Sequence, residues 1–181
     1  MGEFYEDGIK ILRYFKKHRS EYFSVRNCRL LGIEMPLVVE VEKNTFLKGY
    51  LDVVLYDETL NKVIIIDFKT STRGWKDKEK KDEIKTSQLV MYKEYFAQQY
   101  NWDVENIDIE FIILKRKIWE QSEFKQSHLQ SFKPASGKTT RNKVIKNFKT
   151  FLSECFNQDG KPNLEREFTK NFESCRFCPI S

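Results

Sequence analysis

The sequence predicts a mixed α/β fold in which helices pack on a single layer of sheet. Apolar residues recur at helical spacing near both ends of the chain, and strand-like runs fill residues 28 to 70. A second helical segment separates these runs from one further strand. A chain of 181 residues, 40% of them hydrophobic, is long enough to bury a core, so we expect a single domain over residues 1–181.

The elements follow one another as helix, three strands, helix, strand and helix. They lie at about 3–18 (helix), 28–41, 46–57 and 62–70 (strands), 80–99 (helix), 107–117 (strand) and 139–156 (helix). A short polar turn joins the second and third strands, which makes them antiparallel neighbours. We therefore expect a central mixed sheet, a three-stranded antiparallel meander plus a further strand, flanked by helices.

Charge and composition narrow the class of protein. The net charge is +5 and the pI about 8.9, a mild basic bias that fits a polyanionic partner. No stretch reaches the roughly 18 consecutive apolar residues that cross a bilayer, and the first ten residues contain no apolar signal core. We expect no membrane partner and a cytoplasmic protein, of a bacterial or phage-infected cell.

The third strand ends in two opposite charges. Residues 63–66 are apolar without alternation, which is typical of a strand buried on both faces at the centre of a sheet. Because side chains alternate between faces, Asp67 and Lys69 share one face and Phe68 takes the other. A simple ion pair there would scarcely offset its own desolvation, so a further charged component is expected.

A second carboxylate, Asp52, interrupts the neighbouring strand. Two nearby carboxylates repel each other unless a divalent cation lies between them. Magnesium prefers hard oxygen ligands and suits a site with one or two carboxylates plus substrate phosphate oxygens. Lys69 would then orient or deprotonate the attacking water, or balance charge in the transition state. The alternative is that Asp52 and Asp67 are ordinary strand-end residues that face solvent.

The stretch "GYLDVVLYDETLNKVIIIDFKTSTRGW", followed by "QLVMY", resembles the PD-(D/E)xK nuclease superfamily and its RecB-like exonuclease branch. The branch pattern is G-x-x-D, a short hairpin, a D/E-x-K strand end and Q-x-x-x-Y on the next helix. The resemblance implies a restriction-endonuclease-like core with Mg²⁺ or Mn²⁺ bound by Asp52 and Asp67. It makes Lys69 the catalytic lysine and places Gln88 and Tyr92 near the scissile phosphate.

Several positions are weaker candidates. Glu34 precedes the G-x-x-D strand, as a glutamate does in many relatives, and would either bind the metal or brace the site. The backbone carbonyl of Phe68 is a further candidate ligand. RecB-like exonucleases often carry a metal-binding histidine on the first helix, but here that helix has only His18, at its far end. Gln88 and Tyr92 share their helix face with Ile84, so they would alternatively be polar tips at the edge of the core.

Basic and aromatic side chains supply candidate contacts to nucleic acid. The candidates are Trp75, Lys115, Arg116, Arg141 and Lys143, with Trp119 as a second exposed aromatic. Basic residues beside the site would follow a phosphate backbone, and exposed aromatics would stack on unpaired bases. Ordinary solubility charge is the alternative for each of them.

The cysteines resemble part of an iron–sulfur motif. In iron–sulfur members of the RecB-like branch, one upstream cysteine joins three near the C-terminus. Cys28 takes the upstream place, and the C-x-x-C of Cys175 and Cys178 in the 170–181 tail supplies two more. Cys155 lies on the apolar face of a helix and is a poor fourth ligand. Since such clusters are held by four ligands, we expect no iron–sulfur cluster in this chain.

Taken as a resemblance, the motifs imply a metal-dependent nuclease that hydrolyses DNA phosphodiester bonds, an exonuclease in recombination, repair or phage DNA metabolism. A helicase or recombination protein is an expected partner. The alternative is a catalytically inactive module that keeps the fold and binds nucleic acid or a protein partner. A third interpretation is a nuclease that acts on RNA. Strandedness, polarity and oligomeric state do not follow from the sequence.

Overall fold

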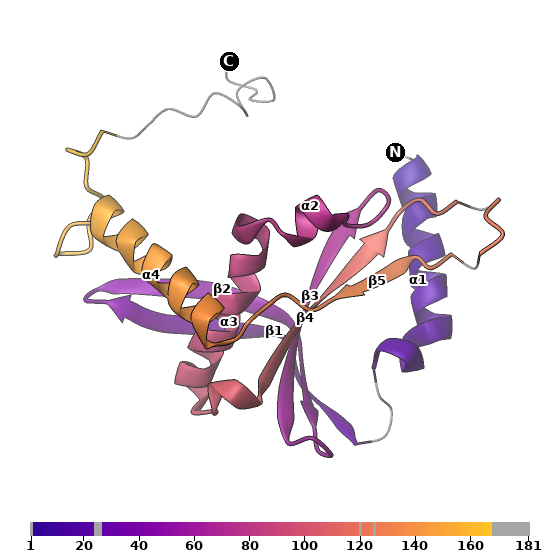
Figure 1. Ribbon diagram of the computed structural model, residues 1–181, viewed down its shortest axis with the longest axis horizontal. Coiled ribbons are helices and arrows are strands. Elements are labelled where there is room, and N and C mark those ends of the chain that lie inside the picture. The colour runs from indigo at the N-terminus through magenta and orange to yellow at the C-terminus, as the bar shows by residue number, and fades with distance from the viewer. Residues whose placement is uncertain (1, 24–26, 120, 125, 168–181) are drawn as a thin grey trace.

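A computed structural model describes residues 2–23, 27–119, 121–124 and 126–167 (Figure 1). Its elements are α1 (Gly2–Tyr22), β1 (Cys28–Glu42), β2 (Thr45–Asp57), β3 (Lys62–Ser71), α2 (Asp77–Lys80), α3 (Glu83–Tyr100), η1 (Val104–Asn106), β4 (Ile107–Lys115), β5 (Leu129–Phe132) and α4 (Lys138–Cys155). The predicted mixed α/β fold is confirmed. Within the described ranges, no helix combines the length and apolar character needed to cross a bilayer.

The five strands form one sheet in the order β1-β2-β3-β4-β5. The first three form the predicted antiparallel meander, β4 runs parallel to β3, and β5 is antiparallel to β4. The expectation of a central third strand is confirmed, since Val63 and Ile65 are fully buried. β5 was not predicted, because its four residues are too few to show a period.

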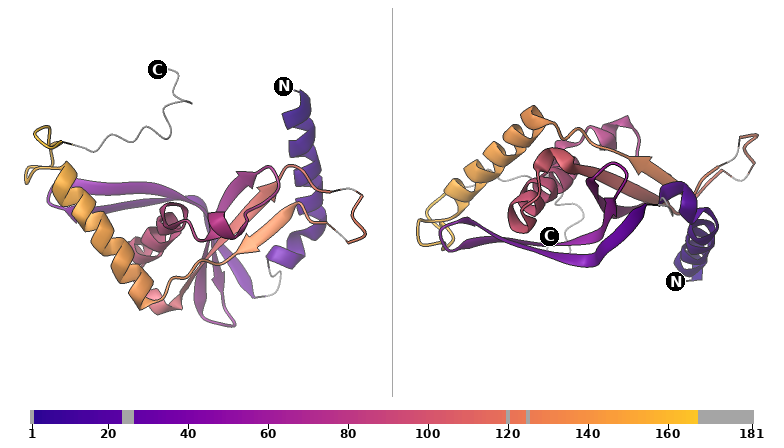
Figure 2. Two further views of the ribbon diagram at one scale, coloured as in Figure 1. Left: turned by 45° about the horizontal axis from the view of Figure 1, so that its top comes forward. Right: turned by 90° about the horizontal axis from the view of Figure 1, so that it is seen from below.

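Helices cover both faces of the sheet, and each face has its own apolar cluster. On one face α3 packs between the sheet and α4 (Figure 2), over a cluster that includes Ile65, Phe96 and Phe111. On the other face the aromatic residues of α1 cover a smaller cluster around Ile66 and Ile112. The alternation of β3 between these clusters is what directs successive side chains of its end to opposite sides.

Ion pairs connect the beginning of α1 to the residues that directly follow β4. Asp7 is buried, with the Lys117 ammonium 3.2 Å from its Oδ1 and an Arg116 guanidinium nitrogen 3.9 Å from its Oδ2. At the other end of α1, the ring of His18 is stacked on Tyr14 and its Nδ1 lies 2.6 Å from a carboxylate oxygen of Glu21. These contacts give His18 a packing role within α1.

Candidate active site

Asp52 and Asp67 meet where β2 and β3 separate. The last pair of the ladder is Val53 with Ile66, so Asp52 and Asp67 occupy the next register position. There the Asp52 side chain replaces a backbone acceptor, because its Oδ2 accepts a 2.7 Å hydrogen bond from the backbone N–H of Phe68. This bond holds the Asp52 carboxylate against the end of β3.

A break in the alternation of β2 explains the spacing of the G-x-x-D motif. Leu51 and Val54 both pack in the cluster under α3, although residues three apart in a regular strand point to opposite faces. The break falls at Asp52. Across from it in the β1 register lies Glu34, an exposed residue with φ of 50°. Gly49 and Asp52, although three residues apart, can therefore both lie on the α3 side of the sheet.

Asp67 is 3% exposed and faces α3, whereas Phe68 packs against Phe15 of α1 on the other face. Burial raises the pKa of the Asp67 carboxyl above its ordinary value, and the charge of Asp52 adds to the rise, although Lys69 opposes it. The Lys69 ammonium lies 2.8 Å from Oδ2 of Asp67. That buried oxygen has no hydrogen bond of good geometry among the described residues, so the contact is an ion pair only.

A chain of hydrogen bonds leads from Lys69 into α3. The Lys69 ammonium donates to the side-chain oxygen of Gln88 (2.9 Å), whose amide nitrogen lies 3.0 Å from the Tyr92 hydroxyl. Tyr92 in turn packs on Gly49, where a Cβ atom would lie only 3.1 Å from the hydroxyl oxygen. The glycine of the motif therefore makes room for the tyrosine. The structure thus brings Gly49, Asp52, Asp67, Lys69, Gln88 and Tyr92, the six positions of the motif, close together.

A cleft of about 480 Å³ opens beside Lys69 and Gln88. Ser71, the last residue of β3, and Gly74 form one wall, and Ile84, 89% exposed, also lines the cleft. Ile84 lies on the same side of α3 as Gln88, as expected, because both line the cleft, but it is exposed there and does not join the core. The cleft gives a phosphate group access to the lysine from solvent.

The loop after β3 is fixed by residues that the sequence did not single out. Gln130 of β5 accepts from the Trp75 N–H (2.7 Å) and donates to the Trp75 carbonyl (3.0 Å). Gly74 has φ of 101°, and a Cβ there would lie 2.9 Å from the side-chain oxygen of Gln130, so the position favours glycine. A glycine three residues past a strand end was the available signal, whereas Gln130 gave none.

The donor set suits a hard divalent cation. Two carboxylates converge, and one buried oxygen of Asp67 is met only by the Lys69 ammonium among the described residues. The described residues contain no group of three or more His, Cys, Asp or Glu placed to hold a metal ion. Mg²⁺ does not require such a group, since it keeps several waters and binds through one or two carboxylates plus substrate phosphates. Asp52 and Asp67 therefore fit Mg²⁺ or Mn²⁺.

Two of the predicted nucleic-acid contacts are contradicted by burial. Trp75 is 9% exposed and packs against Phe111 with ring centroids 5.0 Å apart. The two hydrogen bonds between Gln130 and the Trp75 backbone hold the ring in this position. Arg141 is 7% exposed, and its guanidinium lies 3.2 Å from Glu94 and 2.7 Å from Glu105. Arg141 is therefore enclosed by acidic partners, and Trp75 contributes only a small exposed part to the lining of the cleft, too little for stacking on a base.

The remaining basic candidates lie at the surface in different settings. Lys143 is exposed and paired with Glu83 at 2.5 Å. Arg116 donates to the Thr72 hydroxyl (3.0 Å), and its guanidinium carbon lies 4.6 Å from the centroid of the Phe4 ring. Lys115 lies beside Ser71 in the β3–β4 register, on the face of Asp67 and Lys69. Of these three, only Lys115 belongs to the sheet face that carries Asp67 and Lys69, whereas Lys143 lies on α4, which covers that face through α3.

The family model of the PD-(D/E)XK nuclease superfamily matches residues 8–181, a stretch that includes every position of the site. The chain belongs to the PD-(D/E)XK nuclease superfamily. The five-stranded mixed sheet with flanking helices fits the restriction-endonuclease-like core of this superfamily, as predicted. PD-(D/E)XK nucleases act on nucleic acid and generally use Mg²⁺ or Mn²⁺, which agrees with the donor set of the two carboxylates. No curated protein matches the chain.

Proposed function

We propose that this protein is a metal-dependent nuclease that hydrolyses DNA phosphodiester bonds in the cleft beside Lys69. One observation carries the proposal. The buried Asp67 carboxylate has an oxygen that only the Lys69 ammonium meets among the described residues, and a second carboxylate lies beside it. A fold that had lost catalysis would gain stability by replacing such a charge, so its presence weighs against an inactive binding module.

Asp52 and Asp67 would hold the metal ion. The ion, when bound, supplies Lewis-acid polarisation of the phosphate and a more acidic water. The chain's own residues do the rest. Lys69 lies on the same face and stabilises negative charge that develops on the phosphate oxygens, while Gln88 fixes the direction of its ammonium group. Tyr92 positions Gln88 in turn.

The finer assignment to an exonuclease of DNA recombination, repair or phage metabolism, working with a helicase or recombination protein, rests on the RecB-like motif. Its support is the joined chain of Lys69, Gln88 and Tyr92, which links the D-x-K strand end to the helix that carries the branch-specific pair. The hydrogen bonds link the three residues in the same order in which they occur in the motif. The exonuclease assignment therefore depends on this helix pair and not on the two carboxylates.

The experiment incubates the protein with linear and circular DNA, single- and double-stranded, and with single-stranded RNA. Each is tested with Mg²⁺, with Mn²⁺ and with EDTA. We expect hydrolysis of linear DNA with either metal, none in EDTA, and intact circular DNA. Cleavage of circles would contradict the exonuclease assignment alone. Hydrolysis undiminished by EDTA, or absent from every substrate with both metals, would contradict the proposed function.

A further inference from the structure

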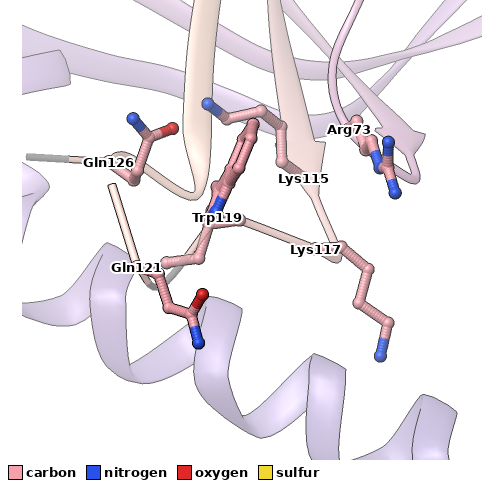
Figure 3. A pocket seen from close by; sticks show the side chains of 7 residues that line it. Arg73, Lys115, Lys117, Trp119, Gln121 and Gln126 are labelled. Atoms are coloured by element: carbon pink, nitrogen blue, oxygen red, sulfur yellow. The ribbon is translucent and has the colours of Figure 1, made fainter. Parts of the chain in front are cut away.

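A second and larger pocket, of about 820 Å³, lies beyond the ends of β3 and β4. The side chains that define it are Arg73, Lys115, Lys117, Trp119, Gln121 and Gln126 (Figure 3). In the close-up, Trp119 stands between two amide side chains on one side and Arg73 with Lys117 on the other. The pocket therefore joins an aromatic face, cationic groups and amide groups.

The basic side chains of the second pocket differ in whether a carboxylate neutralises them. Lys117 is neutralised by Glu3 (2.7 Å) and Asp7 (3.2 Å). In the described part of the chain, Arg73 and Lys115 have no carboxylate within 4 Å. Burial lowers the pKa of Lys115, and no neighbouring anion opposes the effect. An anionic ligand would supply the missing negative charge, so the pocket favours a phosphate group.

Trp119 supplies an aromatic face that the fold leaves uncovered. Its side chain is 74% exposed. The amide nitrogen of Gln126 lies 3.1 Å from the Ser122 hydroxyl and 3.3 Å from the Phe124 carbonyl, which orients this side chain within its loop. Aromatic rings stack on bases, and amide groups bind base edges. Because the Gln126 nitrogen donates within its loop, this side chain offers its oxygen as an acceptor. The cationic groups, the aromatic ring and the amides therefore correspond to the phosphate, the base face and the base edge of one nucleotide.

The second pocket shares a wall with the catalytic cleft. Lys115 lies beside Ser71 in the β3–β4 register, and a Cβ at Gly74 would lie 3.0 Å from Cδ of Lys115. Ser71 and Gly74 also line the cleft that contains Lys69. Ser71 is two residues from Lys69, which is about 7 Å along a strand. The two pockets are therefore close enough for one single-stranded nucleic acid to occupy both.

We propose that this second pocket binds one unpaired nucleotide of the substrate strand, next to the phosphate that lies at Lys69. The phosphate contacts Arg73 and Lys115, the base stacks on Trp119, and the amides of Gln121 and Gln126 face its edge. A base within a duplex is stacked on both faces, so only an unpaired base can occupy the site. The inference rests on the proposed function and narrows its substrate to single-stranded DNA or frayed ends.

Binding measured without hydrolysis tests the site. Fluorescence anisotropy in EDTA compares a single-stranded oligonucleotide, a blunt duplex of equal length and a free deoxynucleoside monophosphate as competitor. The variants are Trp119→Ala, Trp119→Phe and Arg73→Ala. The matched controls are Phe46→Ala and Lys43→Ala, at the β1–β2 turn, which lies on the opposite side of the molecule from the 116–128 loop (Figure 1). Phe46 is 61% exposed, so it controls for loss of an exposed aromatic.

We expect Trp119→Ala to weaken single-strand binding at least about fivefold, Trp119→Phe to restore part of the loss, and the duplex affinity to change little. A plot of log affinity against log salt concentration has a negative slope. Arg73→Ala should make this slope shallower by about 0.7, because one phosphate contact is lost, and Lys43→Ala should leave it unchanged. Equal losses for single strand and duplex would overturn the proposal. The free monophosphate should compete only at a large excess over the oligonucleotide, because it fills this pocket alone, and no competition at any excess would also overturn the proposal.

The failure of this inference is distinguishable from the failure of the proposed function. Unchanged single-strand affinity in Trp119→Ala, with metal-dependent hydrolysis intact, would remove the second pocket and leave the nuclease assignment standing. The expected affinity losses without any hydrolysis would do the reverse. Trp119 lies at the surface, so its substitution should leave the melting temperature unchanged.

Discussion

The backbone N–H of Phe68 donates a 2.7 Å hydrogen bond to Oδ2 of Asp52, at the point where the pairing of β2 and β3 ends. One residue of the D-x-K strand end thereby fixes the carboxylate of the neighbouring strand. The bond couples the two halves of the site through the backbone, so the position of Asp52 does not depend on a metal ion.

Asp52→Asn should keep the fold and lose activity. The amide oxygen of asparagine can still accept from Phe68, so we expect the melting temperature to change little. The loss of one metal-binding charge should lower kcat/KM about 100-fold or more. Asp52→Ala should lose both the hydrogen bond and the activity. Steady-state hydrolysis and thermal melts check this pair, and an Asp52→Asn variant that melts like Asp52→Ala would contradict the structural role of the bond.

Asp67→Asn should stabilise the metal-free protein. Because the pKa of Asp67 is raised in the fold, the folded state binds its proton more tightly than the unfolded chain, and the ionised carboxylate destabilises the fold at neutral pH. The variant should therefore melt above wild type at pH 7 in EDTA. The difference should shrink as the pH falls toward the ordinary value of 3.8. A wild type more stable than the variant at pH 7, with the gap closing in acid, would contradict the direction of the shift.

Gln88 and Tyr92 should act on the rate and not on the fold. Gln88→Ala removes the acceptor that directs the Lys69 ammonium, and Tyr92→Phe removes the hydroxyl that contacts Gln88. We expect lower kcat with little change in KM, and a smaller effect for Tyr92→Phe because it acts through Gln88. Thermal melts accompany the kinetics. A large loss of stability with unchanged kcat would instead favour two polar residues at the edge of the core.

The protein should contain no iron–sulfur cluster. Cys175 and Cys178 lie outside the described residues, so the expectation rests on the sequence, which offers three plausible ligands. We expect anaerobically purified protein to be colourless and to lack stoichiometric iron. Metal analysis of that protein is the measurement. A content near four iron atoms per chain would overturn the expectation and would draw Cys155 into the ligand set.

Local patterns were sufficient to predict four of the five strands and the relative placement of Asp67 and Lys69. The unbroken apolar run at 63–66 marked a buried strand, and the alternation of the next three residues set the faces of Asp67 and Lys69. The burial of Trp75 could not be predicted, because it depends on Gln130, which is 55 residues away and belongs to the strand that was missed. The second pocket likewise required the structure, since it joins the loop after β3 to the loop after β4.

The most direct test of the account is hydrolysis of a labelled single-stranded DNA with Mg²⁺ by three proteins: wild type, Asp67→Asn and Asp159→Asn. Asp159 is 54% exposed and bound to Lys161, so its substitution removes an equal charge from the surface. The account predicts that Asp159→Asn retains the wild-type rate and that Asp67→Asn, folded and at least as stable as wild type without metal, has lost about 100-fold or more in kcat/KM. Hydrolysis by Asp67→Asn at the wild-type rate would contradict the assignment of the active site.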